Sequence, residues 1–164
     1  MRFENIGIVG SGIMGSGVAE VAASTGASVT VRARTTAGAD AVLVAVDESL
    51  ARQVEKGKRD VEDAADVRRR IKVTTELSDL AACNLVIETV VENLEVKIET
   101  FRALDAVVGP STIIATCTST LPVIDLAAQV RHPERVCGVH FFNPVSAMAL
   151  VEVVRPLTAS DETM

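Results

Sequence analysis

The sequence has no tryptophan and no tyrosine, and only four phenylalanines among its 164 residues. An aromatic platform for stacking exposed bases is therefore lacking, and the core has to be built from valine, isoleucine, leucine and alanine. An excess of basic charge is lacking too, since 16 Lys and Arg stand against 22 Asp and Glu, for a formal net charge of −6. This balance gives no electrostatic reason to expect nucleic acid as the main partner, although a local basic patch for a phosphorylated ligand stays open.

Long apolar runs and paired cysteines are also lacking. No run reaches the roughly 18 to 20 residues of a membrane span, and the N-terminal MRFENIGIVG has none of the features of a signal peptide. We therefore expect a cytoplasmic protein without a membrane partner. The cysteines are far apart and form no CxxC pair, which indicates neither a disulfide framework nor a metal site. We expect buried, reduced thiols at Cys83, Cys117 and Cys137.

Short β-branched runs alternate along the chain with longer segments of helical period. This pattern is typical of crossover units on a mostly parallel sheet, so we predict a doubly wound α/β fold with a terminal antiparallel portion. The expected strands are Asn5–Val9, Ser28–Ala33, Ile71–Thr74, Leu85–Glu88, Thr112–Thr116, Arg135–Phe142 and Ala149–Val154. The expected helices are Ile13–Ser24, Ala37–Lys56, Asp60–Arg70, Leu94–Val108 and Pro122–Gln129.

The length suits one domain with a sizeable core, which we assign to residues 1–156. Residues 157–164 are expected to begin a linker or helix, because Thr158 or Ser160 followed by acids is a helix-start signal. The chain stops within the first turn of that helix, which favours a fragment of a longer protein. The run KGKRDVEDAADVRRRIK is rich in charge of both signs and is expected to form helical material projecting from the domain, or simply a solvated face.

A glycine fingerprint follows the first expected strand and opens the first expected helix. The stretch IGIVGSGIMGSG supplies Gly10, Gly12 and Gly15 at the spacing G-x-G-x-x-G. Gly10 permits the tight turn, Gly12 lets a pyrophosphate approach the backbone, and Gly15 lets helix and strand pack closely. Phosphates then meet free amides at the helix start, which begins with Ile13 and Met14. The stretch predicts a dinucleotide site, with a glycine-rich turn that binds no ligand as the alternative.

The two histidines lie in different surroundings. His132 is in the polar loop RHPER, which favours a surface role, whereas His140 is in the apolar run RVCGVHFF and is either a core residue or a catalyst. Glu152 is in the apolar strand LVEVV, where a carboxylate without a partner would carry a large desolvation cost. If the two strands are neighbours, Glu152 reaches His140 and makes it a general base of fixed tautomer. Such a base beside a dinucleotide suits alcohol oxidation.

A run of hydroxyl side chains, TCTST, occupies positions 116–120 directly after an expected strand. This is the sheet edge where ligands bind in open α/β folds. Its hydroxyls either cap the next helix or hold a substrate oxygen.

Four stretches together resemble the NAD-binding domain of the 3-hydroxyacyl-CoA dehydrogenases: IGIVGSGIMGSGVAEVAASTG, NLVIETVVENLEVKIETF, CTSTLPVIDLA and PERVCGVHFFNPVSAMALVEVV. The resemblance covers essentially the whole chain and is most specific in the His-Phe-Phe-Asn-Pro block. It implies a Rossmann-type fold and an oxidoreductase of fatty acid metabolism. Such an enzyme interconverts (S)-3-hydroxyacyl-CoA and 3-oxoacyl-CoA with NAD or NADP.

The resemblance also implies roles for single residues. His140 is by this likeness the catalytic base and Glu152 its partner. Ser119 takes the position of a serine that contacts both the substrate oxygen and the nicotinamide. Asn143 takes that of an asparagine near the nicotinamide.

Further positions carry over from the same family. Glu92 and Lys97 match residues that contact the cofactor, whereas Ser49 and Lys56 align with a serine and a lysine that meet coenzyme A in some members. The resemblance further implies a second, all-helical domain that forms a homodimer and closes over the acyl-CoA substrate. Without that domain, we expect the chain to be weakly active or inactive.

The chain departs from the family at two positions. Cys117 replaces an asparagine, and Ala33 replaces the acid at the end of the second strand, which in NAD enzymes binds the adenosine ribose. Ala33 removes the repulsion of a 2′-phosphate, and Arg34 offers a charged fork suited to phosphate; strand alternation points Arg32 to the opposite face. The triplet Ala33-Arg34-Thr35 also resembles the Asn-Arg-Thr turn of NADP-dependent hydroxyacid dehydrogenases. We therefore predict NADP over NAD, the alternative being a free-standing or degenerate nucleotide-binding domain without turnover.

Overall fold

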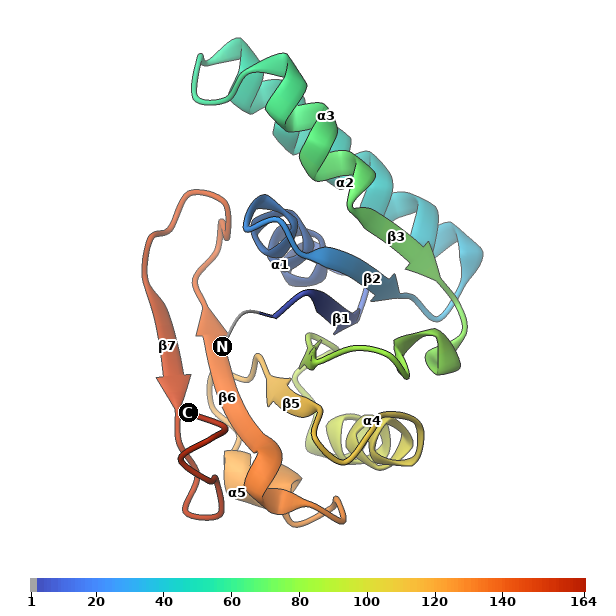
Figure 1. Ribbon diagram of the computed structural model, residues 1–164, viewed down its shortest axis with the longest axis vertical. Helices are drawn as coiled ribbons and strands as arrows, with labels where there is room; N and C mark the ends of the chain where they lie inside the picture. The colour runs from blue at the N-terminus through green and yellow to red at the C-terminus, as the bar shows by residue number, and fades with distance from the viewer. Residues whose placement is uncertain (1–2) are drawn as a thin grey trace.

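The computed structural model describes residues 3–164, and within this range a seven-stranded sheet lies between two layers of helices (Figure 1). The strands are β1 (Asn5–Val9), β2 (Ser28–Arg32), β3 (Ile71–Thr74), β4 (Leu85–Glu88), β5 (Ile113–Thr116), β6 (Val136–Phe141) and β7 (Val151–Val154). The helices are α1 (Ile13–Ser24), α2 (Thr36–Glu55), α3 (Val61–Arg69), α4 (Leu94–Val107) and α5 (Val123–Ala127). Two short 3₁₀ turns are η1 (Leu77–Leu80) and η2 (Pro133–Arg135).

The strand order is β3-β2-β1-β4-β5-β6-β7, with β1 to β6 parallel and β7 antiparallel to β6. The expected fold class is confirmed. Most element bounds differ from the expected ones by at most one residue. The expected last strand was too long, since β7 begins at Val151 and not at Ala149, and α5 ends at Ala127, two residues before Gln129.

Aliphatic side chains fill both sides of the sheet, as the scarcity of aromatics requires. Strand alternation sends Ile6 and Ile8 of β1 into the cluster under α1 and α2, and Val9 into the cluster under α4 and α5. Phe101 on α4 is fully buried in the second cluster. Burying each such side chain contributes about 1.5 to 3 kcal/mol, so the two clusters fix the sheet and its helices as one body.

Helices α2, α3 and α4 begin with side-chain caps, but α1 does not. The oxygens of Thr35, Asp60 and Asn93 each accept a backbone N–H from three residues on, at 2.7 to 3.1 Å. The N-cap of α1 is Gly12, which has no side chain to offer. The first amides of α1 are therefore left for a ligand or for water.

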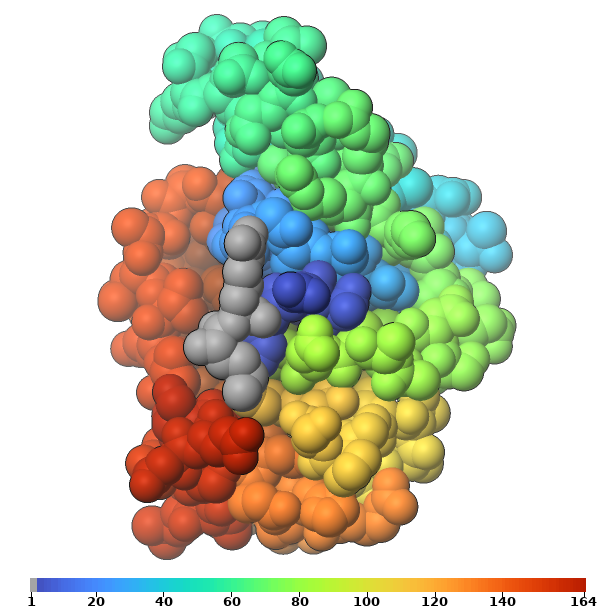
Figure 2. Space-filling model, in the orientation of Figure 1, coloured from blue at the N-terminus to red at the C-terminus, as the bar shows by residue number. Residues whose placement is uncertain are grey.

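The hairpin of α2 and α3 stands out from the body, as expected of the charge-rich run (Figure 2). Its α2 helix is held to α1 near the turn of the hairpin, because Glu20 of α1 is 3% exposed and accepts a hydrogen bond from Gln53 Nε2 at 2.5 Å. Arg59, between the two helices, donates to Ser24 Oγ at 3.0 Å. These contacts fix the direction in which the hairpin projects.

The last residues form turns and not the start of a helix. Ser160 Oγ accepts the backbone N–H of Thr163 at 3.2 Å, which is the cap geometry that its sequence signal predicted. The hydroxyl of Thr163 donates to the Glu134 carbonyl at 2.8 Å, so the segment is tied back to the domain. Among residues 3–164, no helix combines the length and apolarity that crossing a membrane requires.

Candidate active site

The glycine fingerprint lies where the sheet order reverses, between β1 and β4. Gly10 has φ +126°, and a Cβ there would lie 2.8 Å from the Thr89 carbonyl oxygen. A Cβ on Gly15 would lie 2.1 Å from the Gly10 carbonyl oxygen, whereas one on Gly12 would meet nothing within 4 Å. Only glycine fits at positions 10 and 15, because backbone fills the space. Gly12 faces open space at the position where ligands bind in such folds.

This cradle fits a dinucleotide pyrophosphate. The amides of Ile13 and Met14 lie in the first turn of α1 behind an N-cap without a side chain, and Ile13 is 77% exposed. Helix N-termini attract anions through these free amides and through the helix dipole. The first turn of α1 carries no acidic residue that would repel a phosphate. Gly10, Gly12, Gly15, Ile13 and Met14 thus lie in the turn and helix start where the sequence placed them, and their role in holding a cofactor stays a prediction.

His140 and Glu152 lie opposite each other across β6 and β7. The His140 Nδ1 and Glu152 Oε2 atoms are 2.8 Å apart, and His140 Nε2 is 3.2 Å from Ser119 Oγ. The ring of Phe142 meets the His140 ring edge-on, with centroids 4.7 Å apart. The predicted contact between Glu152 and His140 is confirmed, and Ser119 completes a chain of three groups.

The hydrogen bonds of His140 fix its tautomer. The carboxylate of Glu152 can only accept, so Nδ1 of the imidazole carries the hydrogen. In the neutral ring, Nε2 then has a free lone pair, and the Ser119 hydroxyl donates to it. Nε2 is therefore the atom from which His140 can act as a base.

The expected burial of Glu152 is wrong. Its side chain is 54% exposed, whereas that of His140 is 20% exposed. All four residues of β7 are exposed, because β7 is an edge strand that no helix among residues 3–164 covers. Apolar composition alone does not indicate burial here, since an uncovered edge strand has the same composition as a buried one.

The expectation that a hydroxyl of the 116–120 run caps the next helix is wrong, because α5 begins after Pro122 without a side-chain cap. Thr118 Oγ1 instead accepts the backbone N–H of Leu121 at 3.0 Å, within the turn before α5, while Ser119 contacts His140. Asn143 is exposed beyond the end of β6, and among residues 3–164 its side chain makes no hydrogen bond to His140 or Ser119. The structure therefore brings together His140, Glu152 and Ser119 but leaves Asn143 apart from them.

The three cysteines differ in burial. Cys83 and Cys137 are buried as expected, and burial raises the pKa of each thiol to about 11. Cys117 is only half-buried, so the expectation fails there, although desolvation also raises its pKa. Cys117 begins the turn that carries Ser119, at the mouth of the site rather than in the core.

Glu92 and Lys97 lie close together but differ in burial. Lys97 is 1% exposed, so its ammonium lies behind the site, whereas the Glu92 side chain is 41% exposed. Burial by itself would raise the pKa of Glu92, but hydrogen bonds from Thr118 and Ser119 and the charge of Lys97 hold it below its ordinary value. Glu88, a fully buried carboxylate at the end of β4 that binds Lys97, was not predicted as a site residue. An acid that directly follows the apolar residues LVI could have indicated a buried carboxylate.

The end of β2 has the features predicted for the adenosine side. Ala33 is 1% exposed and Arg34 is exposed, while Thr35 caps α2. β2 ends at Arg32, one residue earlier than expected, and Arg32 Nε donates to the Thr75 carbonyl at 3.2 Å. Arg32 is therefore engaged elsewhere, and Arg34 is the cation left at this corner.

The two residues matched to coenzyme A lie on the projecting hairpin. Ser49 is half-buried in α2 and accepts a hydrogen bond from Gln53 at 3.3 Å, while Lys56 is exposed just after α2. Neither contacts His140 or Ser119 in the part of the chain that the structure describes.

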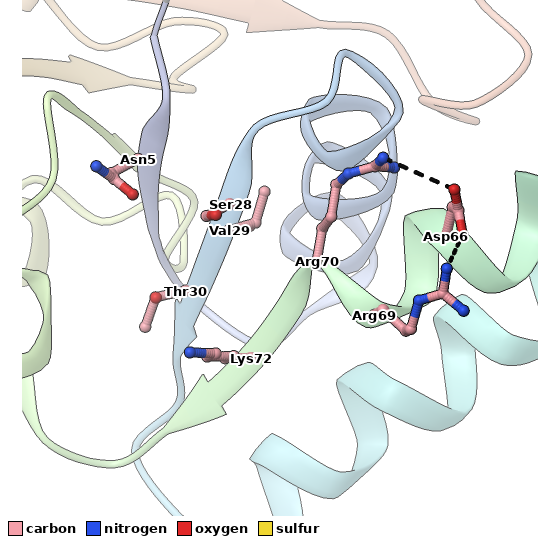
Figure 3. A pocket seen from close by; sticks show the side chains of 8 residues that line it. All are labelled: Asn5, Ser28, Val29, Thr30, Asp66, Arg69, Arg70 and Lys72. Carbon is pink, nitrogen blue, oxygen red and sulfur yellow. Dashed lines mark hydrogen bonds and ion pairs between the residues drawn. The ribbon is translucent and has the colours of Figure 1, made fainter.

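A separate cavity of about 360 Å³ lies at the amino ends of β1, β2 and β3, away from the fingerprint (Figure 3). Figure 3 shows Arg69 and Arg70 reaching toward Asp66, whereas Lys72 points away from them. Asp66 already pairs with both arginines and Lys72 points elsewhere, so we do not take this cavity as a second candidate site.

The fold, the fingerprint and the site at the carboxyl edge of the sheet define the class: a Rossmann-type dinucleotide-binding domain. The family model described as "3-hydroxyacyl-CoA dehydrogenase, NAD binding domain" matches residues 5–164, and the chain belongs to this family. The resemblance found in the sequence is thus confirmed.

Individual relatives agree with this family. The chain is 41% identical to a probable 3-hydroxybutyryl-CoA dehydrogenase of Bacillus subtilis, over 99% of this chain and 57% of that protein. It is 40% identical to a 3-hydroxyadipyl-CoA dehydrogenase of Escherichia coli, over 100% of this chain and 34% of that protein. The crystal structure of (S)-3-hydroxybutyryl-CoA dehydrogenase from Ralstonia eutropha has a TM-score of 0.96 at 39% identity, over 99% of this chain and 57% of that one. The chain thus spans little more than half the length of the first and third of these proteins.

Proposed function

We propose that this chain is the cofactor-binding and catalytic-base half of a 3-hydroxyacyl-CoA dehydrogenase. The observation that carries the proposal is the hydrogen-bonded chain Glu152, His140 and Ser119 at the sheet edge that holds the glycine fingerprint. A bound nicotinamide cofactor would supply the hydride acceptor for the carbon that bears the substrate hydroxyl. The reaction would interconvert (S)-3-hydroxyacyl-CoA and 3-oxoacyl-CoA.

In this mechanism, His140 moves the proton. Its Nε2 takes the hydroxyl proton of the substrate while Glu152, at Nδ1, stabilises the imidazolium that forms. When the substrate hydroxyl takes the lone pair of Nε2, the Ser119 hydroxyl leaves it and donates to the substrate oxygen instead, which orients that oxygen. In the reductive direction the same Nε2 returns the proton to the forming alcohol.

The test is a rate measurement with acetoacetyl-CoA and reduced cofactor, on this chain joined to the additional region that its relatives possess. His140→Ala should lower kcat by about 10²- to 10⁴-fold, the usual contribution of a positioned general base. His132→Ala is the matched control, because that ring is 43% exposed and hydrogen-bonds Glu134 on the surface. An unchanged rate in His140→Ala would contradict the assignment. Tight cofactor binding with no turnover in the joined protein would instead support a nucleotide-binding domain without activity.

We infer that a second domain covers β7 in the complete protein. Residues 1–156 would form the cofactor domain and residues 157–164 the link to a helical domain, which by resemblance forms a homodimer and closes over the acyl-CoA. The support is the apolar surface of β7, where Val153 is 58% exposed and the following Leu157 is fully exposed. Such a surface favours weak self-association of this chain alone. Sedimentation that shows only monomer at high concentration would contradict this inference.

We propose further that the domain prefers NADP to NAD. Ala33 leaves no carboxylate at the end of β2 to repel a 2′-phosphate, and Arg34 is exposed beside it. Gly38 at the start of α2 lies against Ser11 of the fingerprint, since a Cβ there would lie 3.0 Å from Ser11 Oγ. The corner around Arg34 thus adjoins the pyrophosphate cradle, as the adenosine ribose of a dinucleotide requires.

Calorimetry with NADP and with NAD tests this preference. One charge-assisted phosphate contact is worth about 1 to 3 kcal/mol, or about 5- to 150-fold in Kd. Arg34→Ala should remove that advantage and leave NAD binding unchanged. Arg52→Ala, an exposed arginine near the far end of α2, is the control and should change neither affinity. Equal affinity of the unaltered chain for both cofactors would refute the preference.

The projecting hairpin would meet coenzyme A in this proposal. Lys56 is exposed and carries the positive charge that a phosphorylated ligand needs, and Ser49 lies on the same helix. Lys56→Ala should therefore raise KM for the acyl-CoA with little change in kcat in the rate measurement described above.

A further inference from the structure

A buried ion pair lies directly behind the turn that carries Ser119. Lys97 on α4 is 1% exposed, and its Nζ lies 2.8 Å and 3.0 Å from the two carboxylate oxygens of Glu88, which is 0% exposed. Glu88 also accepts the hydroxyl of Thr116 at 2.7 Å and the backbone N–H of Val90 at 2.6 Å. Every partner of this carboxylate is thus a hydrogen-bond donor fixed on β5, α4 or the segment after β4.

Glu92 connects this pair to the surface. Its Oε2 lies 3.4 Å from Lys97 Nζ, while its Oε1 accepts the backbone N–H of Ser119 at 3.1 Å and the hydroxyl of Thr118. One carboxylate therefore binds the buried ammonium with one oxygen and the Ser119 turn with the other. The Ser119 hydroxyl in turn reaches His140 Nε2 at 3.2 Å.

We propose that Glu88 is a positioning residue of the active site, which acts through Lys97 and Glu92 to set the Ser119 hydroxyl against His140. Glu88 supplies the main counter-charge of Lys97 through two contacts, and the Val90 carbonyl accepts a third at 3.5 Å, so Glu92 meets the ammonium only at 3.4 Å. Without the Glu88 charge, a buried ammonium would be left uncompensated and would draw in Glu92 as its only carboxylate. Glu92 would then release the Ser119 turn. The role of Ser119 and His140 in this inference rests on the proposed function.

The test compares two isosteric variants that remove different contacts of the same carboxylate. Glu88→Gln removes the charge that holds Lys97, whereas Thr116→Val removes only the hydroxyl that donates to Glu88. Both should lower stability. Only Glu88→Gln should speed amide hydrogen exchange of Ser119, by roughly tenfold, because that N–H loses its acceptor on Glu92. Glu95→Gln, an exposed acid in the first turn of α4, controls for the change in net charge.

A double variant keeps the inference testable if Glu88→Gln does not fold. Glu88→Gln with Lys97→Met removes both buried charges at similar volume, which proteins often tolerate. No buried ammonium is then left to draw Glu92 away, so Ser119 exchange should stay like that of the unaltered chain. Faster Ser119 exchange in the double variant, or exchange like that of the unaltered chain in Glu88→Gln, would overturn the positioning role.

Hydrogen exchange needs no turnover, so it separates this inference from the proposed function. In the joined protein, Glu88→Gln should lower kcat by roughly tenfold or more with little change in KM for the acyl-CoA, because the site is misaligned rather than the binding surface lost. A faster Ser119 exchange together with an unchanged rate in His140→Ala would keep the positioning of the turn and reject the proposed function. An equal loss of kcat in Thr116→Val would mean that Glu88 acts through stability alone.

Discussion

Gly15→Ala should disrupt the cofactor cradle from inside the fold. The added methyl would lie 2.1 Å from the Gly10 carbonyl oxygen and 3.0 Å from Thr89 Oγ1. The Gly10 carbonyl is backbone, so no rotamer change can relieve the clash, and α1 has to move away from β1 by about 1 Å. A 2.1 Å contact with backbone belongs at the upper end of the cost of overpacking, about 3 kcal/mol or more. Alanine returns about 1 kcal/mol through its higher helix propensity, which offsets only part of this cost.

The matched control is Gly12→Ala, since a Cβ there meets nothing within 4 Å and the backbone is extended at φ −81°. Thermal unfolding should show a fall of several degrees for Gly15→Ala, at about 2 to 4 °C per kcal/mol for a chain of this size, and little change for Gly12→Ala. Calorimetry should show weaker dinucleotide binding in both, because the methyl of Gly12→Ala fills the approach to the pyrophosphate. Equal stability of Gly15→Ala and the unaltered chain would refute the packing argument.

Two further predictions concern the buried ionisable groups. Burial alone would raise the pKa of Asp105, but hydrogen bonds from Arg131 and Arg135 hold that pKa below its ordinary value. The stability that ionised Asp105 contributes is therefore present above its unfolded pKa and is lost as pH falls through its folded pKa. Asp105→Asn should cost about 3 to 5 kcal/mol at neutral pH, because buried Arg135 loses its carboxylate, and should flatten the acid limb below about pH 4 in urea unfolding. A thiol reagent at pH 8 should label at most Cys117 in the folded chain and all three cysteines in denaturant, since the pKa of both buried thiols is about 11. Rapid labelling of all three in the folded chain would contradict the burial seen here.

The contact between His140 and Glu152 was predictable because two apolar strands separated by a short Asn-Pro connection tend to be neighbours. The antiparallel register then places the two residues opposite each other. The exposure of Glu152 was not predictable in the same way. Whether an apolar strand is covered depends on which other segments pack against it, and no local pattern in LVEVV records that.

The contacts of Glu88 could not be predicted from the local sequence either. Its position at the end of β4 follows from the sequence pattern, but its role depends on Lys97, nine residues later on α4, and on Thr116, at the end of β5. Thr116 meets Glu88 only because β5 pairs with β4 in the sheet, which places the two residues opposite each other. Such three-body contacts are set by tertiary packing, because each residue taken alone is compatible with many surroundings.

The sequence by itself determined the fold class, most element bounds and the glycine cradle. Those features rest on local rules: strand and helix periodicity, and the backbone freedom that Gly10 requires at φ +126°. Only the tertiary structure decided that Ser119 joins His140 while Thr118 caps a turn, that Lys97 lies behind Glu92, and that β7 is uncovered. Hydroxyls, ammonium groups and apolar strands each fit several environments, and the packing of distant segments selects one of them.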